Sequence, residues 1–208
     1  MSDALFEHCN FNKYQAFIFD MDGTLVDSGK LHEVGWTQTL NRYQIPVERA
    51  LMRSLAGVPT KDTLEHLIKH FQCPQTASLD EMNNFKEQVV RENARTYVKP
   101  TALKRLAEKY HGYKAMSVGT GAYTAEAEAI IALCDLQSLL SYVVGADKVA
   151  APKPAPDTFL LCAELMQVKP ENCIVFEDSR MGLDAAASAG MDAVDVLKAF
   201  NIENDYFL

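Results

Sequence analysis

Two aspartates separated by one residue follow an apolar run near the start of the chain, in "FIFDMDGTLVDS" at residues 17–28. Alternation along a strand places Asp20 and Asp22 on the same side, so both carboxylates can address one ligand. Because neighbouring carboxyls resist joint ionisation, they can divide into an ionised nucleophile and a proton carrier. A metal ion and a phosphate ester would account for this arrangement. A turn followed by a helix cap is the simpler alternative.

Five short apolar runs have the composition of strands buried on both faces of a parallel sheet. Helical patterns separate the later runs, as in Phe159, Cys162 and Met166, which are spaced three and four residues apart. The Ala-rich stretch 180–189 ends at Gly190, which is typical of a helix C-terminus. The alternation predicts an α/β fold, a Rossmann-like parallel sheet flanked by helices with right-handed crossovers. The predicted strands are residues 15–19, 113–118, 142–146, 172–177 and 192–196.

Residues 28–98 interrupt this alternation with helical patterns only, in which Leu64 and Ile68 recur on one helical face. The simplest account is an all-helical domain inserted after the first strand, where open parallel sheets bind ligands. We therefore predict a core domain of residues 1–27 and 99–208, with residues 28–98 as the inserted domain.

The sequence closely resembles the haloacid dehalogenase superfamily of phosphohydrolases, and within it the β-phosphoglucomutase-like subfamily. The first motif of that family, an apolar strand followed by DxDGT, is matched by Asp20 to Thr24. The resemblance covers residues 14–208 and implies three further motifs, each at the end of a strand. The segments "VGTG" (118–121) and "KPAPDTFLLCAELMQV" (153–168) are similar to bacterial fructose-1-phosphate and other sugar phosphatases.

The second and third motifs of the family bind phosphate. The resemblance implies that Thr120 in "AMSVGTGA" donates its hydroxyl to a phosphate oxygen and that the Gly121 N–H adds a second donor. Lys153 in "APKPAPDTF" lies between two prolines that restrict the chain. Its ammonium would offset charge on Asp20 and on the phosphate. Lys148 is the rival for this role, and a plain turn and a solvated loop lysine are the simpler alternatives.

The fourth motif is an acidic pair, Glu177 and Asp178 in "CIVFEDSRMG", at the end of another buried run. Carboxylate oxygens suit Mg²⁺, which keeps several waters and takes a few carboxylates together with substrate phosphate. The resemblance implies Asp20, the backbone carbonyl of Asp22 and Asp178 as metal ligands, with Glu177 either a direct ligand or one layer further out. A helix N-cap is the alternative for Asp178 and Ser179, and it is compatible with metal binding.

The resemblance also implies a mechanism. Asp20 would attack phosphorus in line and form an aspartyl-phosphate, and Asp22 would protonate the leaving alcohol and then deprotonate the attacking water. Mg²⁺, Lys153 and Thr120 would stabilise charge on the phosphoryl oxygens. The acid at Asp22 excludes the dehalogenases and phosphonate-cleaving members, which lack it. We therefore expect an Mg²⁺-dependent phosphoric monoester hydrolase for small phosphorylated metabolites, such as the sugar phosphate fructose 1-phosphate.

The helical insert resembles the cap domain of the family, which closes over the crevice and contacts the leaving group. His32 shares its spacing from Asp20 with sugar-phosphate mutases of the family, although a solvated or capping histidine is the alternative. Lys61, in "AGVPTKDTL" at 56–64, aligns with the substrate-specificity loop. Thr60 replaces an arginine of the glucose-phosphate mutases, which favours hydrolysis over β-phosphoglucomutase-type phosphotransfer.

The composition of the chain limits which classes of partner and which cellular compartment we expect. A net charge of −8 argues against nucleic acid and anionic membranes. Scattered cysteines without a CxxC pair indicate free thiols in a reducing compartment, and the N-terminal "MSDALFEHCNFNKY" has no signal-peptide pattern. We expect a cytoplasmic monomer that acts on a small phosphorylated metabolite, without a nucleic-acid or membrane partner. A phosphate-binding regulator without turnover is the alternative from a different class.

Overall fold

The computed structural model describes residue 6 and residues 8–208, and its chain divides into two compact units. The core unit comprises the residues up to Asp27 together with Lys99–Glu203, and the helical unit comprises Ser28–Val98 together with Asn204–Leu208. Among the described residues, no helix combines the length and the apolar character needed to cross a membrane. The core helices are α5 (Leu103–Tyr110), α6 (Thr124–Leu133), α7 (Asp157–Leu165), α8 (Arg180–Ser188) and α9 (Val196–Phe200).

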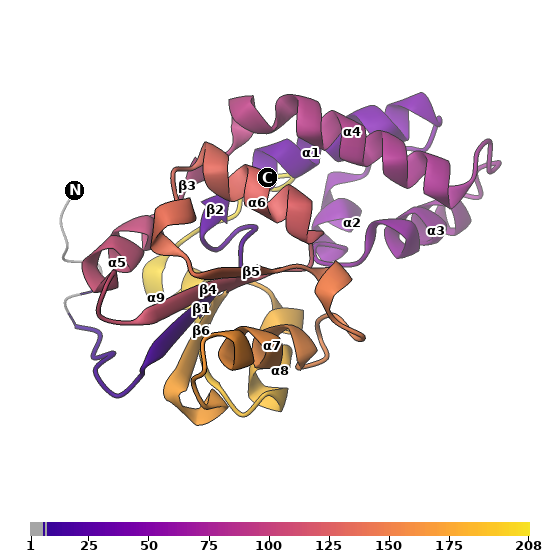
Figure 1. The fold of residues 1–208 in the computed structure, drawn as a ribbon. Coiled ribbons are helices and arrows are strands. Elements are labelled where there is room, and N and C mark those ends of the chain that lie inside the picture. The colour runs from indigo at the N-terminus through magenta and orange to yellow at the C-terminus, as the bar shows by residue number, and fades with distance from the viewer. Residues whose placement is uncertain (1–5, 7) are drawn as a thin grey trace. The chain divides into compact units, whose positions relative to one another are not determined.

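A parallel sheet lies at the centre of the core unit, and Figure 1 shows its strands between two layers of helices. Within residues 6 and 8–208 it has five strands, in the order β5–β4–β1–β6–β7. Each strand lies in one of the five predicted runs to within a residue, so the predicted α/β fold is confirmed. The strands are β1 (Ala16–Phe19), β4 (Ala115–Gly119), β5 (Tyr142–Val144), β6 (Cys173–Glu177) and β7 (Asp192–Asp195).

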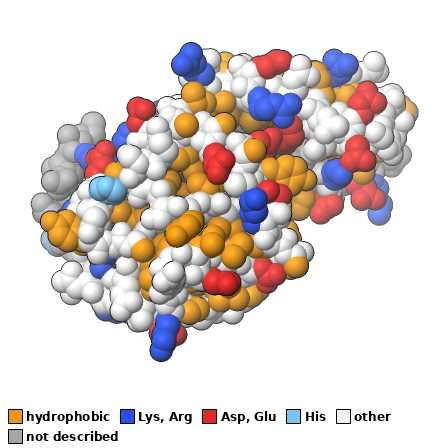
Figure 2. Space-filling view, viewed as in Figure 1, with side chains coloured by type: hydrophobic (Ala, Val, Ile, Leu, Met, Phe, Trp, Pro, Cys, Tyr) orange, Lys and Arg blue, Asp and Glu red, His pale blue; other side chains and the backbone are white. Residues whose placement is uncertain are grey.

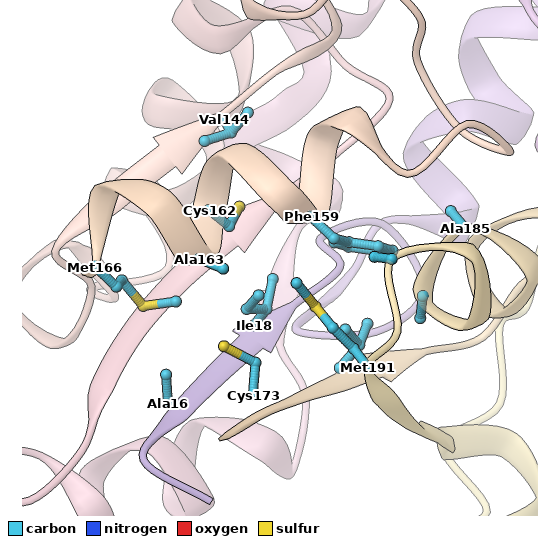
Figure 3. Packing of buried hydrophobic residues seen from close by; sticks show 13 residues of the cluster. Ala16, Ile18, Val144, Phe159, Cys162, Ala163, Met166, Cys173, Ala185 and Met191 are labelled. Atoms are coloured by element: carbon cyan, nitrogen blue, oxygen red, sulfur yellow. The ribbon is translucent and has the colours of Figure 1, made fainter. Parts of the chain in front are cut away.

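The two faces of β1 bury different side chains. Ala16 and Ile18 face a cluster from α7 and α8, in which Phe159 is also fully buried, as Figure 3 shows. Phe17 and Phe19 point to the opposite face, because successive side chains alternate along a strand. There the rings of Phe19 and Phe176 stack with their centroids 5.1 Å apart. The strand is therefore buried on both sides, which is why its sequence lacks polar alternation.

Local signals set the ends of α8. The Ser179 hydroxyl accepts a hydrogen bond from the Gly182 backbone N–H at 3.1 Å, which satisfies one of the donors left open at a helix N-terminus. Gly190, with φ of +72°, follows the helix in the left-handed conformation that glycine adopts without steric cost. The helix end predicted at Gly190 is confirmed. The cap at the other end fixes where the loop after β6 stops.

A short antiparallel pair joins the two chain segments that lead into and out of the helical insert. It consists of β2 (Val26–Asp27) and β3 (Lys99–Pro100), and the Lys99 ammonium lies 3.1 Å from an Asp27 carboxylate oxygen. The sequence did not predict this pair, because two-residue strands carry no periodic pattern.

The helical unit is built from α1 (Gly29–Arg42), α2 (Arg49–Ser54), α3 (Thr60–His70) and α4 (Leu79–Tyr97). α1 and α4 make extensive contact with each other. The apolar faces of all four helices contribute to one buried cluster, as an inserted unit with its own core requires. The fully or almost fully buried members of this cluster include Trp36, Leu40, Met52, Leu64, Leu67 and Met82.

The last five residues correct one predicted boundary. The sequence pattern assigns residues 204–208 to the core domain, but in the structure they pack with the helical unit. Phe207 is 1% exposed within the cluster that contains Trp36, and its backbone N–H donates to a Glu33 carboxylate oxygen at 3.2 Å. Sequence order places this segment after the last strand, but burial of one aromatic ring decides where it packs.

Candidate active site

The carboxyl ends of three neighbouring strands lie level with one another and position the site. The register pairs Phe19 of β1 with Val118 of β4 and with Phe176 of β6. Asp20, Gly119 and Glu177 are the next residues of these strands or follow them directly, so they share one edge of the sheet. Ligands bind at this edge of open parallel sheets.

Asp20 is the central group of the site. Its side chain is 10% exposed, and Oδ1 accepts a hydrogen bond from the Lys153 ammonium at 2.7 Å. Burial raises the pKa of Asp20 well above its ordinary value; Lys153 opposes this effect, while the charges of Glu177 and Asp178 add to it. Positive charge near Asp20 therefore favours its ionised form.

Lys153 lies in the loop between β5 and α7, and its ammonium bridges two acidic side chains. Its Nζ lies 2.7 Å from Asp20 Oδ1 and 2.8 Å from Glu177 Oε1, and the ring centroid of Phe159 is 4.6 Å away. Burial by itself would lower the pKa of Lys153, but the two carboxylates outweigh burial and raise it. The lysine is therefore held as an ammonium. Its rival Lys148 is exposed, in a 3₁₀ turn at Ala146–Lys148.

The acidic pair at the end of β6 has two different environments. Glu177 is 1% exposed, and its second oxygen, Oε2, accepts the Ser179 backbone N–H at 2.6 Å. Asp178 is half-buried, and its Oδ1 accepts from the Thr24 hydroxyl at 3.4 Å. Each of Asp20, Glu177 and Asp178 offers a carboxylate oxygen, and these oxygens lie within 4.8 Å of one another. The arrangement can hold a divalent cation.

Asp22 lies in the tight turn that follows β1. Its backbone bridges to Val26, and the Gly23 backbone N–H donates to the Val26 carbonyl at 2.8 Å. Gly23 has φ of +80°, a conformation that glycine adopts most readily. The Asp22 side chain is half-buried and is not among the three clustered carboxylates. Its predicted part in metal binding is through the backbone carbonyl, which stays a prediction, as does its role as proton carrier.

Thr120 follows β4 and is 1% exposed. Its backbone N–H donates to the Val144 carbonyl at 2.9 Å, and its hydroxyl oxygen accepts the Ala122 N–H at 3.2 Å. A hydroxyl that accepts this bond still has its own hydrogen to donate. Gly121 is exposed, and a Cβ built on it would meet no atom within 4 Å. The backbone therefore holds Thr120 in place while leaving space beside Gly121.

His32 and Lys61 lie on the helical unit. His32 is half-buried on the first turn of α1, and its backbone N–H donates to the Ser28 carbonyl at 3.0 Å. Lys61 is on the first turn of α3 and pairs with Asp80. Their predicted contacts with substrate stay predictions.

Sequence reasoning missed several supporting groups. Thr24 contacts Asp178, the Ser179 N–H binds Glu177, and Asp147 binds both the backbone N–H and the hydroxyl of Thr124, at 2.7 and 2.8 Å. Because Thr24 is the last residue of the DxDGT motif, the sequence indicated that it belongs to the site, but it did not indicate that Thr24 contacts Asp178. Asp147 in "GADK" carried no signal of its partner, because Thr124 follows a different strand.

The chain matches the model of the haloacid dehalogenase-like hydrolases over residues 14–190. It belongs to this family, and the prediction of the family and of a hydrolase is confirmed.

Several named proteins within this family are similar to the chain. The chain is 41% identical to fructose-1-phosphate phosphatase YqaB of Escherichia coli, over 89% of this chain and 98% of that protein. It is 32% identical to the phosphorylated carbohydrates phosphatase of Thermotoga maritima, over 86% of this chain and 83% of that protein. The solved structure of a Thermotoga maritima protein named for β-phosphoglucomutase has a TM-score of 0.68 and 28% identity, covering 89% of this chain and 91% of that one. These relatives support assignment to the phosphoric monoester hydrolases.

Proposed function

We propose that the chain is an Mg²⁺-dependent phosphatase of small phosphorylated metabolites, and that sugar phosphates such as fructose 1-phosphate are its substrate class. One observation supports the chemistry above all others. Asp20, Lys153 and the adjacent pair Glu177 and Asp178 come from three separate segments of the chain and converge at one edge of the sheet. The names of the two similar phosphatases support the substrate class.

The donor set fits a hard divalent cation. Three carboxylates cluster here, and the Lys153 ammonium pairs with two of them, Asp20 and Glu177. Oxygen ligands of this kind suit Mg²⁺. Asp20, the backbone carbonyl of Asp22 and Asp178 would hold the ion, with Glu177 as a ligand or as their neighbour. When bound, the cation would neutralise charge on the phosphate and on Asp20.

The residues of the chain then have the following roles in the proposed reaction. A carboxylate oxygen of Asp20 forms a bond to phosphorus as the bond from phosphorus to the ester oxygen breaks, and Asp22 gives the leaving alcohol its proton. Asp22 next takes a proton from water, whose oxygen bonds to phosphorus as the bond from phosphorus to Asp20 breaks, which releases inorganic phosphate and restores the Asp20 carboxylate. Lys153 and the Thr120 hydroxyl donate hydrogen bonds to the phosphoryl oxygens in both steps.

The helical unit would supply the substrate specificity. We propose that residues 28–98 act as a cap domain on a core of residues 1–27 and 99–203, with residues 204–208 as part of the cap. His32 and Lys61 would contact the sugar part of the substrate. The absence of an arginine at Thr60 supports hydrolysis over transfer to a second sugar phosphate.

Phosphate release from a panel of phosphorylated metabolites tests this function. With Mg²⁺, we expect turnover of fructose 1-phosphate and related sugar phosphates at rates above those for nucleotides. Excess chelator should stop turnover, and added Mg²⁺ should restore it. Hydrolysis that persists in chelator would contradict the proposed metal dependence. Conversion of β-glucose 1-phosphate to glucose 6-phosphate without phosphate release would identify a phosphotransferase instead, and binding of phosphate without turnover would identify a regulator.

We further propose that the enzyme acts as a cytoplasmic monomer on small substrates, without a nucleic-acid or membrane partner. The net charge of −8 supports the expectation that neither nucleic acid nor an anionic membrane is a partner. On the face drawn in Figure 2, acidic and basic side chains are interspersed, and the described residues there form no basic stripe. The cysteines are free thiols, which a reducing compartment maintains. Light scattering of the purified chain would test the monomer.

A further inference from the structure

Gly182 on the first turn of α8 lies directly against the side chain of Glu177. A Cβ built on Gly182 would lie 1.7 Å from Glu177 Oε1 and 2.0 Å from Glu177 Cδ. No two such atoms can approach this closely, so the Glu177 carboxylate occupies the space that any side chain at position 182 would take. Gly182 is buried, which leaves a larger residue no route into solvent.

The backbone itself does not require glycine at this position. Gly182 lies inside a helix, and it is not among the glycines with positive φ. Glycine is also a poor helix former, whereas alanine is the best, and the same helix continues with three consecutive alanines. The demand for glycine therefore comes from Glu177 and not from the fold of α8.

Glu177 cannot easily move aside to admit a side chain. Its Oε1 accepts from Lys153 Nζ at 2.8 Å, and its Oε2 accepts from the Ser179 backbone N–H at 2.6 Å. The side chain is 1% exposed, so broken hydrogen bonds would not be replaced by bonds to bulk water. A methyl group on residue 182 would force this carboxylate away from Lys153.

Lys153 would carry such a displacement to the reacting group. The ammonium that binds Glu177 also lies 2.7 Å from Asp20 Oδ1. We propose that Gly182 is a positioning residue: by leaving space for Glu177, it fixes the Lys153 ammonium at the nucleophilic carboxylate. The inference rests on the proposed roles of Asp20 and Lys153, and Gly182 itself touches no substrate.

A double-mutant cycle between Gly182 and Glu177 tests the proposal. Gly182→Ala should lower kcat by about 10- to 100-fold, the effect of losing a charge-assisted hydrogen bond in the transition state. It should also lower the Tm of the metal-free protein by about 2–8 °C. In a Glu177→Ala background the same substitution should leave kcat within about twofold and should raise Tm, because only helix propensity then differs.

Ala187→Gly is the matched control, since it exchanges the same two residues at an exposed position of the same helix. It should lower Tm and leave kcat unchanged. If Gly182→Ala alone does not fold, the Tm difference between Glu177→Ala and Glu177→Ala/Gly182→Ala decides the question. A Tm at or above that of Glu177→Ala supports the proposal, and a lower one refutes it.

Two outcomes in folded variants would overturn the positioning role. One is an unchanged kcat in Gly182→Ala, and the other is a loss of Tm that is equal in both backgrounds, which would show that Glu177 does not mediate the effect. A wild-type chain that releases no phosphate from any ester would instead refute the proposed function. The two failures are therefore distinguishable.

Discussion

The Asp20 carboxylate is buried beside the carboxylates of Glu177 and Asp178 and the ammonium of Lys153. At an effective dielectric constant of 20, two unit charges 4 Å apart interact by about 4 kcal/mol. Lys153 offsets one such interaction, but Glu177 and Asp178 both oppose ionisation of Asp20. Burial is the main cause that raises the pKa of Asp20, and the two neighbouring carboxylates add to it, so a bound cation would favour the ionised form of the nucleophile. Charge balance, together with the donor set, is the physical basis of the proposed Mg²⁺ dependence.

The first prediction concerns the nucleophile. Asp20→Asn should reduce phosphate release by on the order of 10⁴-fold or more, because an amide oxygen does not form the covalent intermediate. The fold should persist, since Lys153 keeps its bond to Glu177. Steady-state phosphate release and circular dichroism on the same samples measure the two effects.

Asp184→Asn is the matched control for this substitution. It also removes one carboxylate from the core unit, but its side chain is 48% exposed and pairs with the exposed Arg180. Its activity should equal that of the wild type. Near-wild-type activity in Asp20→Asn would refute the assignment of the nucleophile.

At the scale of elements, one carboxylate ties together the loops that follow β4 and β5. Asp147 Oδ1 accepts from the Thr124 backbone N–H and hydroxyl, and the Gly145 N–H donates to the same hydroxyl at 3.2 Å. Thr120 belongs to the first of these loops, and its N–H binds the Val144 carbonyl at 2.9 Å. The loop that presents the Thr120 hydroxyl is therefore fixed from a neighbouring strand.

The second prediction is that Asp147→Ala lowers both Tm, by a few degrees, and kcat, because α6 loses the acceptor at its N-terminus and the Thr120 loop loosens. Lys148→Ala is the control, since Lys148 is exposed next to Asp147. It should leave both quantities unchanged. A large loss of kcat in Lys148→Ala would favour that lysine over Lys153 as the phosphate-binding one.

The effect of Asp147 should depend on pH in one direction. Hydrogen bonds from the Thr124 backbone and side chain lower the pKa of Asp147 below its ordinary value of 3.8. A group whose pKa is lowered by folding stabilises the protein above its unfolded pKa, and this contribution is lost as pH falls through the folded pKa. The Tm difference between the wild type and Asp147→Ala should therefore be constant down to about pH 4 and shrink below it. A difference that grows toward low pH would contradict this linkage.

The third prediction concerns residues 204–208. Phe207→Ala should lower the stability of the helical unit by about 3–5 kcal/mol, because it removes a fully buried ring from the cluster that contains Trp36. Trp36 is the only tryptophan, so its fluorescence in a denaturant titration reports on this cluster. Leu208→Ala, at a residue that is 63% exposed, should leave the transition unchanged. An unshifted midpoint in Phe207→Ala would show that the segment is not part of the core of the helical unit.

At the scale of the whole molecule, the chain passes between its two units at residues 27–28, 98–99 and 203–204. The first two passages lie next to each other in the β2–β3 pair, where Val26 is opposite Pro100. The third leads to Phe207, which is anchored in the helical cluster. The chain therefore connects the two units at two passages next to the β2–β3 pair and at a third passage that leads into residues 204–208.

The fourth prediction tests the division of labour between the units. If the cap recognises the leaving group, His32→Ala should lower kcat/KM for sugar phosphates by about tenfold or more, and should affect an activated aryl phosphate far less. The aryl ester needs little help because its leaving group is stable without a proton. Parallel assays of the two esters measure the ratio. Equal losses with both esters would show that His32 has no role toward the leaving group.

The sheet, the family and the positions of the chemical groups can all be predicted from the amino-acid sequence. Apolar runs without alternation are a local property of strands buried on both faces, and each motif follows such a run directly or lies in the loop after it. Parallel strands bring their carboxyl ends to one edge, so the order of residues along the chain is enough to predict that Asp20, Thr120 and Glu177 converge.

Which of these groups touch is a property of the folded chain. The Lys153 ammonium between Asp20 and Glu177, the requirement for glycine at 182 and the acceptor role of Asp147 all depend on contacts between different segments of the chain. The burial of Phe207 in the helical unit is of the same kind. Periodicity encodes which face of an element is buried, but it does not encode what packs against that face, since the partner comes from elsewhere in the chain.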